Sequence, residues 1–156
     1  MKPARSAEAY IDGASRGNPG PAGVGVVLCG DEAKPIWEFS KYLGETTNNV
    51  AEYLALVYAL QGALQRGLIR LAVKTDSELL ARQISGAYKV RDGQLRLFYD
   101  LARHLMQGFH SCTVSHIPRE QNTHADRLAG QAVKHRGEQP AAQDSVSASE
   151  EPLFDK

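Results

Sequence analysis

Residues 10–28, YIDGASRGNPGPAGVGVVL, contain the pattern that decides the fold of this chain. One apolar run ends at Asp12, a loop of Gly, Asn and Pro follows, and a second apolar run begins at Ala22. Short apolar runs separated by such turn residues predict antiparallel strands over 7–13 and 22–30. The turn residues GDEAKP precede a third predicted strand over 36–44. We therefore expect the chain to open with an antiparallel meander.

The apolar period changes after Asn48. Apolar residues recur at helical spacing from Val50 to Leu64, and Gly67 follows at a position typical of a helix cap. The segment LIRLAVKTDS alternates like a strand, and ELLARQI has a helical period. A strand that follows a helix predicts a crossover to a parallel neighbour. A loop and helix, a fifth strand in HSCTVSHIP and a last helix in NTHADRLAGQAVKHR, with Asn122 at its N-cap, complete the order βββαβααβα.

Composition indicates one soluble domain. The 156 residues are 42% apolar and 23% charged, and the two cysteines are too few for a disulfide framework. No run approaches the roughly 18 apolar residues of a membrane span, and residues 1–9 lack a signal peptide, so we expect a cytoplasmic protein without a membrane partner. The net charge is zero, but an acidic C-terminal segment leaves residues 1–137 at about +4. We predict a domain over 1–137 and a disordered acidic tail over 138–156.

Four carboxylates are predicted to share one site. In a mixed sheet with the first strand beside the fourth, Asp12 and Asp76 would lie on neighbouring strands. Glu52 and Asp126 lie early in two helices that can pack toward those strands. Such carboxylates would repel one another without cations, and their oxygens favour Mg²⁺ or Mn²⁺, with two ions suited to displacement at phosphorus. Taken singly, each acid could instead form a turn or compensate a helix dipole.

Polar side chains lie beside these acids in the sequence. They could donate hydrogen bonds to phosphates and sugar hydroxyls, which predicts contacts with a nucleic-acid backbone. Turn and cap roles are the alternative, above all for Thr47 and Asn48. The predicted nucleic-acid-binding residues are Ser15, Asn18, Thr47, Asn48, Asn49, Ser77 and Asn122.

Four motifs, in this order, resemble those of type 1 ribonuclease H. They are DGASRGNPGPAGVG, TTNNVAEYLAL, KTDSELL and HIPREQNTHADRLA, each with one of the four acids, and the resemblance runs over about 10–134. It implies an α/β ribonuclease H-like fold, in which a five-stranded mixed sheet has three antiparallel strands, then two parallel strands, and flanking helices.

The resemblance also implies an activity. It is that of a metal-dependent endoribonuclease, which cleaves the RNA strand of an RNA/DNA hybrid to 5′-phosphate and 3′-hydroxyl ends. Glu52 would additionally touch the 2′-hydroxyl beside the scissile phosphate. The family's metal-binding acids match Asp12, Glu52, Asp76 and Asp126, and its backbone contacts match Asn18, Thr47, Asn48 and Asn49.

The family also has a mobile histidine near its last acid. His116, ten positions before Asp126, fits the spacing and is our candidate catalytic histidine. His124, two positions before Asp126, is a rival, and a merely exposed histidine is the third possibility.

Two features differ from the family pattern. The long members have a basic protrusion with tryptophan, whereas the corresponding connection here is short, with Lys89, Arg91 and Arg96 and no tryptophan. Val50 replaces an Arg that binds a DNA phosphate in some relatives.

The alternatives to cleavage of hybrids alone are additional cleavage of double-stranded RNA, a junction resolvase, or a catalytically silent hybrid-binding module. We expect a monomer.

Overall fold

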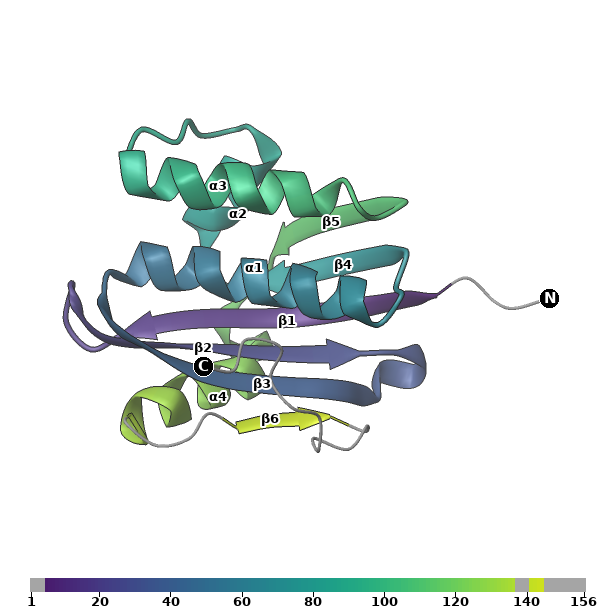
Figure 1. Ribbon diagram of the computed structural model, residues 1–156, viewed down its shortest axis with the longest axis horizontal. Helices are drawn as coiled ribbons and strands as arrows, with labels where there is room; N and C mark the ends of the chain where they lie inside the picture. Colours follow the sequence, from purple (N-terminus) through teal and green to yellow (C-terminus); the bar gives the residue numbers. More distant parts are fainter. Residues whose placement is uncertain (1–4, 137–140, 145–156) are drawn as a thin grey trace, which may run out of the picture.

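The computed structural model describes residues 5–136 and 141–144, and its centre is a mixed six-stranded sheet (Figure 1). The strand order is β5-β4-β1-β2-β3-β6. Pairing is antiparallel from β1 through β2 and β3, and parallel from β1 to β4 and β5. The first five strands confirm the predicted sheet. The strands are β1 (Ser6–Ser15), β2 (Gly20–Cys29), β3 (Pro35–Thr46), β4 (Arg70–Thr75), β5 (Ser111–His116) and β6 (Ala141–Asp144).

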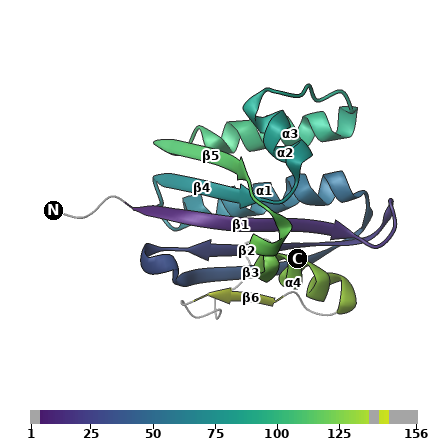
Figure 2. The same cartoon turned by 180° about the vertical axis from the view of Figure 1, so that it is seen from behind.

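Helices cover both faces of the sheet. Figure 1 shows α1, α2 and α3 on one face, and the reverse view in Figure 2 shows α4 on the other. Within the described parts of the chain, no helix combines the length and apolar character needed to cross a membrane. The helices are α1 (Asn48–Gln65), α2 (Glu78–Ser85), α3 (Gly93–Met106) and α4 (Thr123–Lys134), with short 3₁₀ turns η1 (Asp31–Ala33) and η2 (Arg119–Gln121).

Strand β6 differs from the expected disordered tail. Ala141–Asp144 pairs antiparallel with β3, from Trp37 opposite Asp144 to Ser40 opposite Ala141. The edge of β3 would otherwise present unpaired backbone groups, which can pair with a short segment whatever its side chains. Composition predicts poor packing of side chains, but it does not test this backbone pairing. The other residues of the predicted tail lie outside the described residues.

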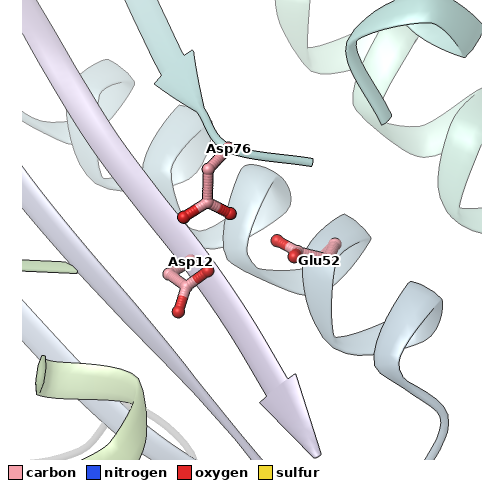
Figure 3. Close-up of side chains that lie close together, drawn as sticks. All are labelled: Asp12, Glu52 and Asp76. Carbon is pink, nitrogen blue, oxygen red and sulfur yellow. The ribbon is translucent and has the colours of Figure 1, made fainter. Parts of the chain in front are cut away.

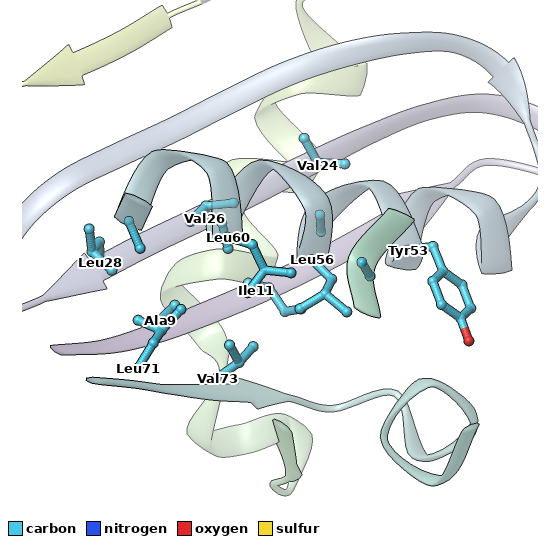
Figure 4. Close-up of a cluster of buried hydrophobic side chains, with 14 of the residues drawn as sticks. Ala9, Ile11, Val24, Val26, Leu28, Tyr53, Leu56, Leu60, Leu71 and Val73 are labelled. Carbon is cyan, nitrogen blue, oxygen red and sulfur yellow. The ribbon is translucent and has the colours of Figure 1, made fainter. Parts of the chain in front are cut away.

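The main core lies between α1 and the sheet (Figure 4). Alternate residues of β1 face this helix, and Ile11 at its centre is fully buried. Burial of one such aliphatic side chain contributes about 1.5–3 kcal/mol. The packing fixes the position of α1 over β1, and therefore of the acid that α1 carries. The fully buried residues here include Ala9, Ile11, Val24, Val26, Leu28, Leu56, Leu60 and Val73.

Candidate active site

Three of the predicted acids converge at one end of the sheet. Ile11 and Thr75 are partners on parallel strands, so Asp12 and Asp76, the next residue on each, emerge side by side. Glu52 reaches them from α1, and Figure 3 shows the three carboxylates turned toward one another. One oxygen from each lies within 4.8 Å of the others. The predicted convergence is confirmed for these three residues.

A glycine allows α1 to approach β1 at this point. A Cβ on Gly13 would lie 2.3 Å from the backbone carbon of Ala51, so no larger residue fits without moving the helix. The Gly13 N–H donates a hydrogen bond to Glu52 Oε1 over 3.0 Å. This close contact places and orients the carboxylate of Glu52.

The fourth acid lies at the rim of the same site. A pocket of about 300 Å³ is lined by Asp12, Glu52, Asp76 and, from the first turn of α4, Asp126. Asp126 is half-buried and does not belong to the cluster of three. It therefore completes the pocket from the opposite face of the sheet.

Arg119 also lines this pocket, although it was not among the predicted site residues. It lies in η2, and its Nη2 is 3.7 Å from Asp126 Oδ1. The side chain is 79% exposed, so the guanidinium remains accessible to a ligand. Its only sequence signal is a cation seven positions before the last acid, which is a weak indication without the fold.

Burial and crowding raise the pKa of two of these carboxyl groups, those of Asp12 and Glu52. Burial, and then the charges of Glu52 and Asp76, raise the pKa of Asp12 from 3.8 to about 9. Burial and the charge of Asp76 raise the pKa of Glu52 to about 8, against the lowering effect of the Gly13 N–H. A positive ion would relieve this repulsion, and the donors are all carboxylate oxygens. The site therefore fits a hard divalent cation.

The comparisons with known proteins agree with this geometry. Residues 10–132 match the family model described as reverse transcriptase-like. The crystal structure of RNase H1 from Halobacterium salinarum superposes with a TM-score of 0.81 at 42% identity, covering 83% of this chain and 98% of that chain. This chain belongs to the type 1 ribonuclease H family. The crystal structure of LC11-RNase H1 in complex with an RNA/DNA hybrid superposes with a TM-score of 0.78 at 41% identity, covering 82% of this chain and 96% of that chain.

Ribonuclease H relatives can be longer than the matched region. The Halobacterium salinarum protein named Ribonuclease HI is 43% identical over 125 residues, which are 80% of this chain and 63% of that protein. The Mycobacterium tuberculosis bifunctional protein Rv2228c is 42% identical over 132 residues, 84% of this chain and 36% of that protein. The match to the second relative therefore covers about a third of its length.

Several polar residues predicted to meet a nucleic acid also have local partners. Asn18 Oδ1 accepts a hydrogen bond from the Asn48 N–H over 3.0 Å, which joins the β1–β2 loop to the start of α1. Thr47 and Ser77 accept hydrogen bonds from the first turns of α1 and α2, and the Ser15 hydroxyl donates to the carbonyl of Gly17. Turn and cap roles are thus present, while Asn18 and Asn49 remain exposed and Asn48 and Ser77 line the pocket.

Asn122 differs from the predicted surface contact. It occupies the N-cap position of α4 but makes no capping hydrogen bond with its side chain. Its Nδ2 instead donates to the Ile11 carbonyl over 2.8 Å and to Asp76 Oδ2 over 3.3 Å, and the residue is 1% exposed. Burial prevents it from touching a nucleic-acid backbone in this conformation. Asn122 is therefore an internal support that holds Asp76, a role that its position in the sequence does not reveal.

The two histidines point to different places. His124 Nε2 lies 3.0 Å from Glu38 Oε2 on β3, so this side chain is engaged away from the three clustered carboxylates. His116 is exposed at the end of β5 and pairs in register with Thr75, directly before Asp76. His116 is not among the residues that line the pocket, so its catalytic role stays a prediction.

Proposed function

We propose that this chain is an endoribonuclease that hydrolyses the RNA strand of RNA/DNA hybrids to 5′-phosphate and 3′-hydroxyl ends. The observation that carries the proposal is the convergence of Asp12, Glu52 and Asp76 in a chain of the ribonuclease H family. The similar LC11-RNase H1 was crystallised with an RNA/DNA hybrid, which supports the same substrate here. The predicted monomeric state and cytoplasmic location belong to this proposal.

We infer that the four acids hold two Mg²⁺ or Mn²⁺ ions. When bound, such ions supply positive charge that activates a water and offsets charge developing at the phosphate. The protein's part is to hold the oxygens in place. The Gly13 N–H orients Glu52, and the Asn122 amide orients Asp76. Asp126 completes the donor set from α4.

Side chains at the pocket rim would bind and orient the substrate. The Arg119 guanidinium can donate to phosphate oxygens beside Asp126. Asn48 and Ser77 line the same pocket, where sugar and phosphate oxygens can accept their hydrogen bonds. A contact between Glu52 and the 2′-hydroxyl would distinguish RNA from DNA. His116 would assist departure of the product from the rim.

The test is cleavage of four end-labelled duplexes, each with Mg²⁺ and with Mn²⁺: hybrid, double-stranded RNA, double-stranded DNA, and DNA with one ribonucleotide. We expect cleavage of the RNA strand of the hybrid and no cleavage by Asp76→Asn, with unchanged circular dichroism. Cutting of double-stranded RNA as well would indicate the dual activity. Binding of the hybrid without cleavage of any duplex would contradict the proposal and favour a silent binding module.

A further inference from the structure

A buried polar network links α1, α2 and the loop after α2. Gln83 of α2 is 6% exposed, and Tyr53, the residue after Glu52 on α1, is 1% exposed. The Tyr53 hydroxyl donates to Gln83 Oε1 over 2.7 Å. Gln83 Nε2 donates to the backbone carbonyl of Lys89 over 3.3 Å. One glutamine thus joins the helix of a catalytic acid to the loop after α2.

The loop over 86–92 is anchored at both ends, because the Arg82 guanidinium lies over the Tyr88 ring and Asp92 Oδ1 accepts a hydrogen bond from the Leu95 N–H at the start of α3. Its Tyr88 N–H donates to the Arg82 carbonyl, and Val90 packs against the core. Lys89 and Arg91, on either side of Val90, are exposed. The alternation places one apolar side chain inward and two cations outward. The hydrogen bond from Gln83 to Lys89 therefore fixes the backbone that presents both cations.

The position of this loop suits a role in binding substrate. It leads into the start of α3, which lies at the same end of the molecule as the start of α1, where Glu52 is carried (Figures 1 and 2). Lys and Arg that contact phosphates contribute affinity independently of base sequence. Holding the backbone that carries these cations lowers the conformational entropy that the loop loses on binding, and so strengthens the contacts.

We propose that Gln83 is a positioning residue that holds Lys89 and Arg91 for contact with the phosphates of the bound hybrid. The inference rests on the proposed function. A buried glutamine without partners would be costly, and here both ends of its amide are used across two helices and a loop. Gln83 acts on substrate affinity through the loop and does not touch the reacting atoms.

The test compares Gln83→Met, which is similar in size, with Gln131→Met, a matched control at an exposed position of α4 on the other face of the sheet. We expect Gln83→Met to raise KM for the hybrid about fivefold at 0.1 M salt with kcat unchanged. From the counterion-release slope for B-DNA, one phosphate contact strengthens binding about eightfold at 0.1 M salt relative to 1 M salt. The control should leave both constants unchanged. Tyr53→Phe, which removes only the hydroxyl, is the second variant and should also raise KM.

A double-mutant comparison separates positioning from a general structural effect. In a Lys89→Ala, Arg91→Ala background, Gln83→Met should no longer raise KM, because no cation remains to be positioned. In the free protein, trypsin should cut after Lys89 and Arg91 faster in Gln83→Met than in the control.

These measurements distinguish failure of the proposed hybrid cleavage from failure of the positioning role of Gln83. A wild-type protein that cleaves no hybrid would overturn the proposed function and this role with it. A cleaving wild type whose KM is unaffected by Gln83→Met and by Tyr53→Phe would overturn this inference alone. An equal rise of KM in the background without the two cations would overturn it as well.

Discussion

Replacing Asp12 by Asn should stabilise the metal-free protein. The folded structure raises the pKa of Asp12 to about 9 from 3.8 by burial and by the nearby Glu52 and Asp76. The unfolded chain, in contrast, releases this proton near pH 4. Because the folded pKa is the higher one, the carboxyl favours folding at acidic pH, and this contribution is lost as the pH rises from about 4 to 9.

The size of the effect follows from this difference. At pH 7, about three units above the pKa of the unfolded carboxyl, that group is ionised in the unfolded chain. The folded one keeps its proton, because its pKa is about 9. Each pH unit corresponds to about 1.4 kcal/mol, so Asp12 lowers the free energy of unfolding by up to about 4 kcal/mol at pH 7. Asn cannot ionise and has nearly the same shape. The variant should recover most of this free energy.

Magnesium should narrow the stability difference between the two proteins. A cation at 100 times its Kd stabilises the folded state by about 2.7 kcal/mol. The wild type, with all its carboxylates, should gain this stability. The Asp12→Asn variant should gain little, because it lacks one ligand, and it should not cleave the hybrid.

The assay is urea unfolding at pH 5, 7 and 9, with EDTA and with Mg²⁺, for the wild type, Asp12→Asn and a control, Asp31→Asn, at an exposed acid. In EDTA the wild type should lose stability between pH 5 and 9, while Asp12→Asn changes less and the control follows the wild type. A gain below about 1 kcal/mol at pH 7, with a pH dependence equal to that of the wild type, would refute the electrostatic account of the site.

Three further predictions concern the rim, the helix contact and the edge of the sheet. Arg119→Ala should lower kcat for the hybrid about 100-fold, the usual effect of losing one donor to a reacting group, with an unchanged thermal midpoint; equal kcat would exclude it from the chemistry. Gly13→Ala should destabilise the protein by more than about 3 kcal/mol in urea, since its Cβ would meet the backbone of α1 at 2.3 Å; a stable variant would show that the helix can shift. Deletion of the chain after Gly137 should leave hybrid turnover within about twofold, because β6 lies on the edge of β3 and not at the acids, and a large loss would assign the removed segment a part in substrate binding.

The sequence alone determined the elements and the chemistry of the site. Apolar residues with a period of two or of 3.6, separated by turn residues, reflect local backbone preference and burial. They therefore predicted the first five strands in their order along the chain. The crossover rule predicted a parallel neighbour for β4, and its placement beside β1, which was a premise of the predicted site, is confirmed. That placement brings Asp12 and Asp76 side by side, and α1 brings Glu52 to them.

The tertiary structure decided where the other polar side chains point. Asn122 occupies the predicted cap, yet its amide turns back to β1 and Asp76, and His124 turns to Glu38. Arg119 enters the pocket only because η2 folds over it. β6 pairs through backbone groups that composition does not describe. In each case the partner is distant in sequence, and the direction of a polar side chain depends on that partner, whereas a periodic pattern reports only the local chain.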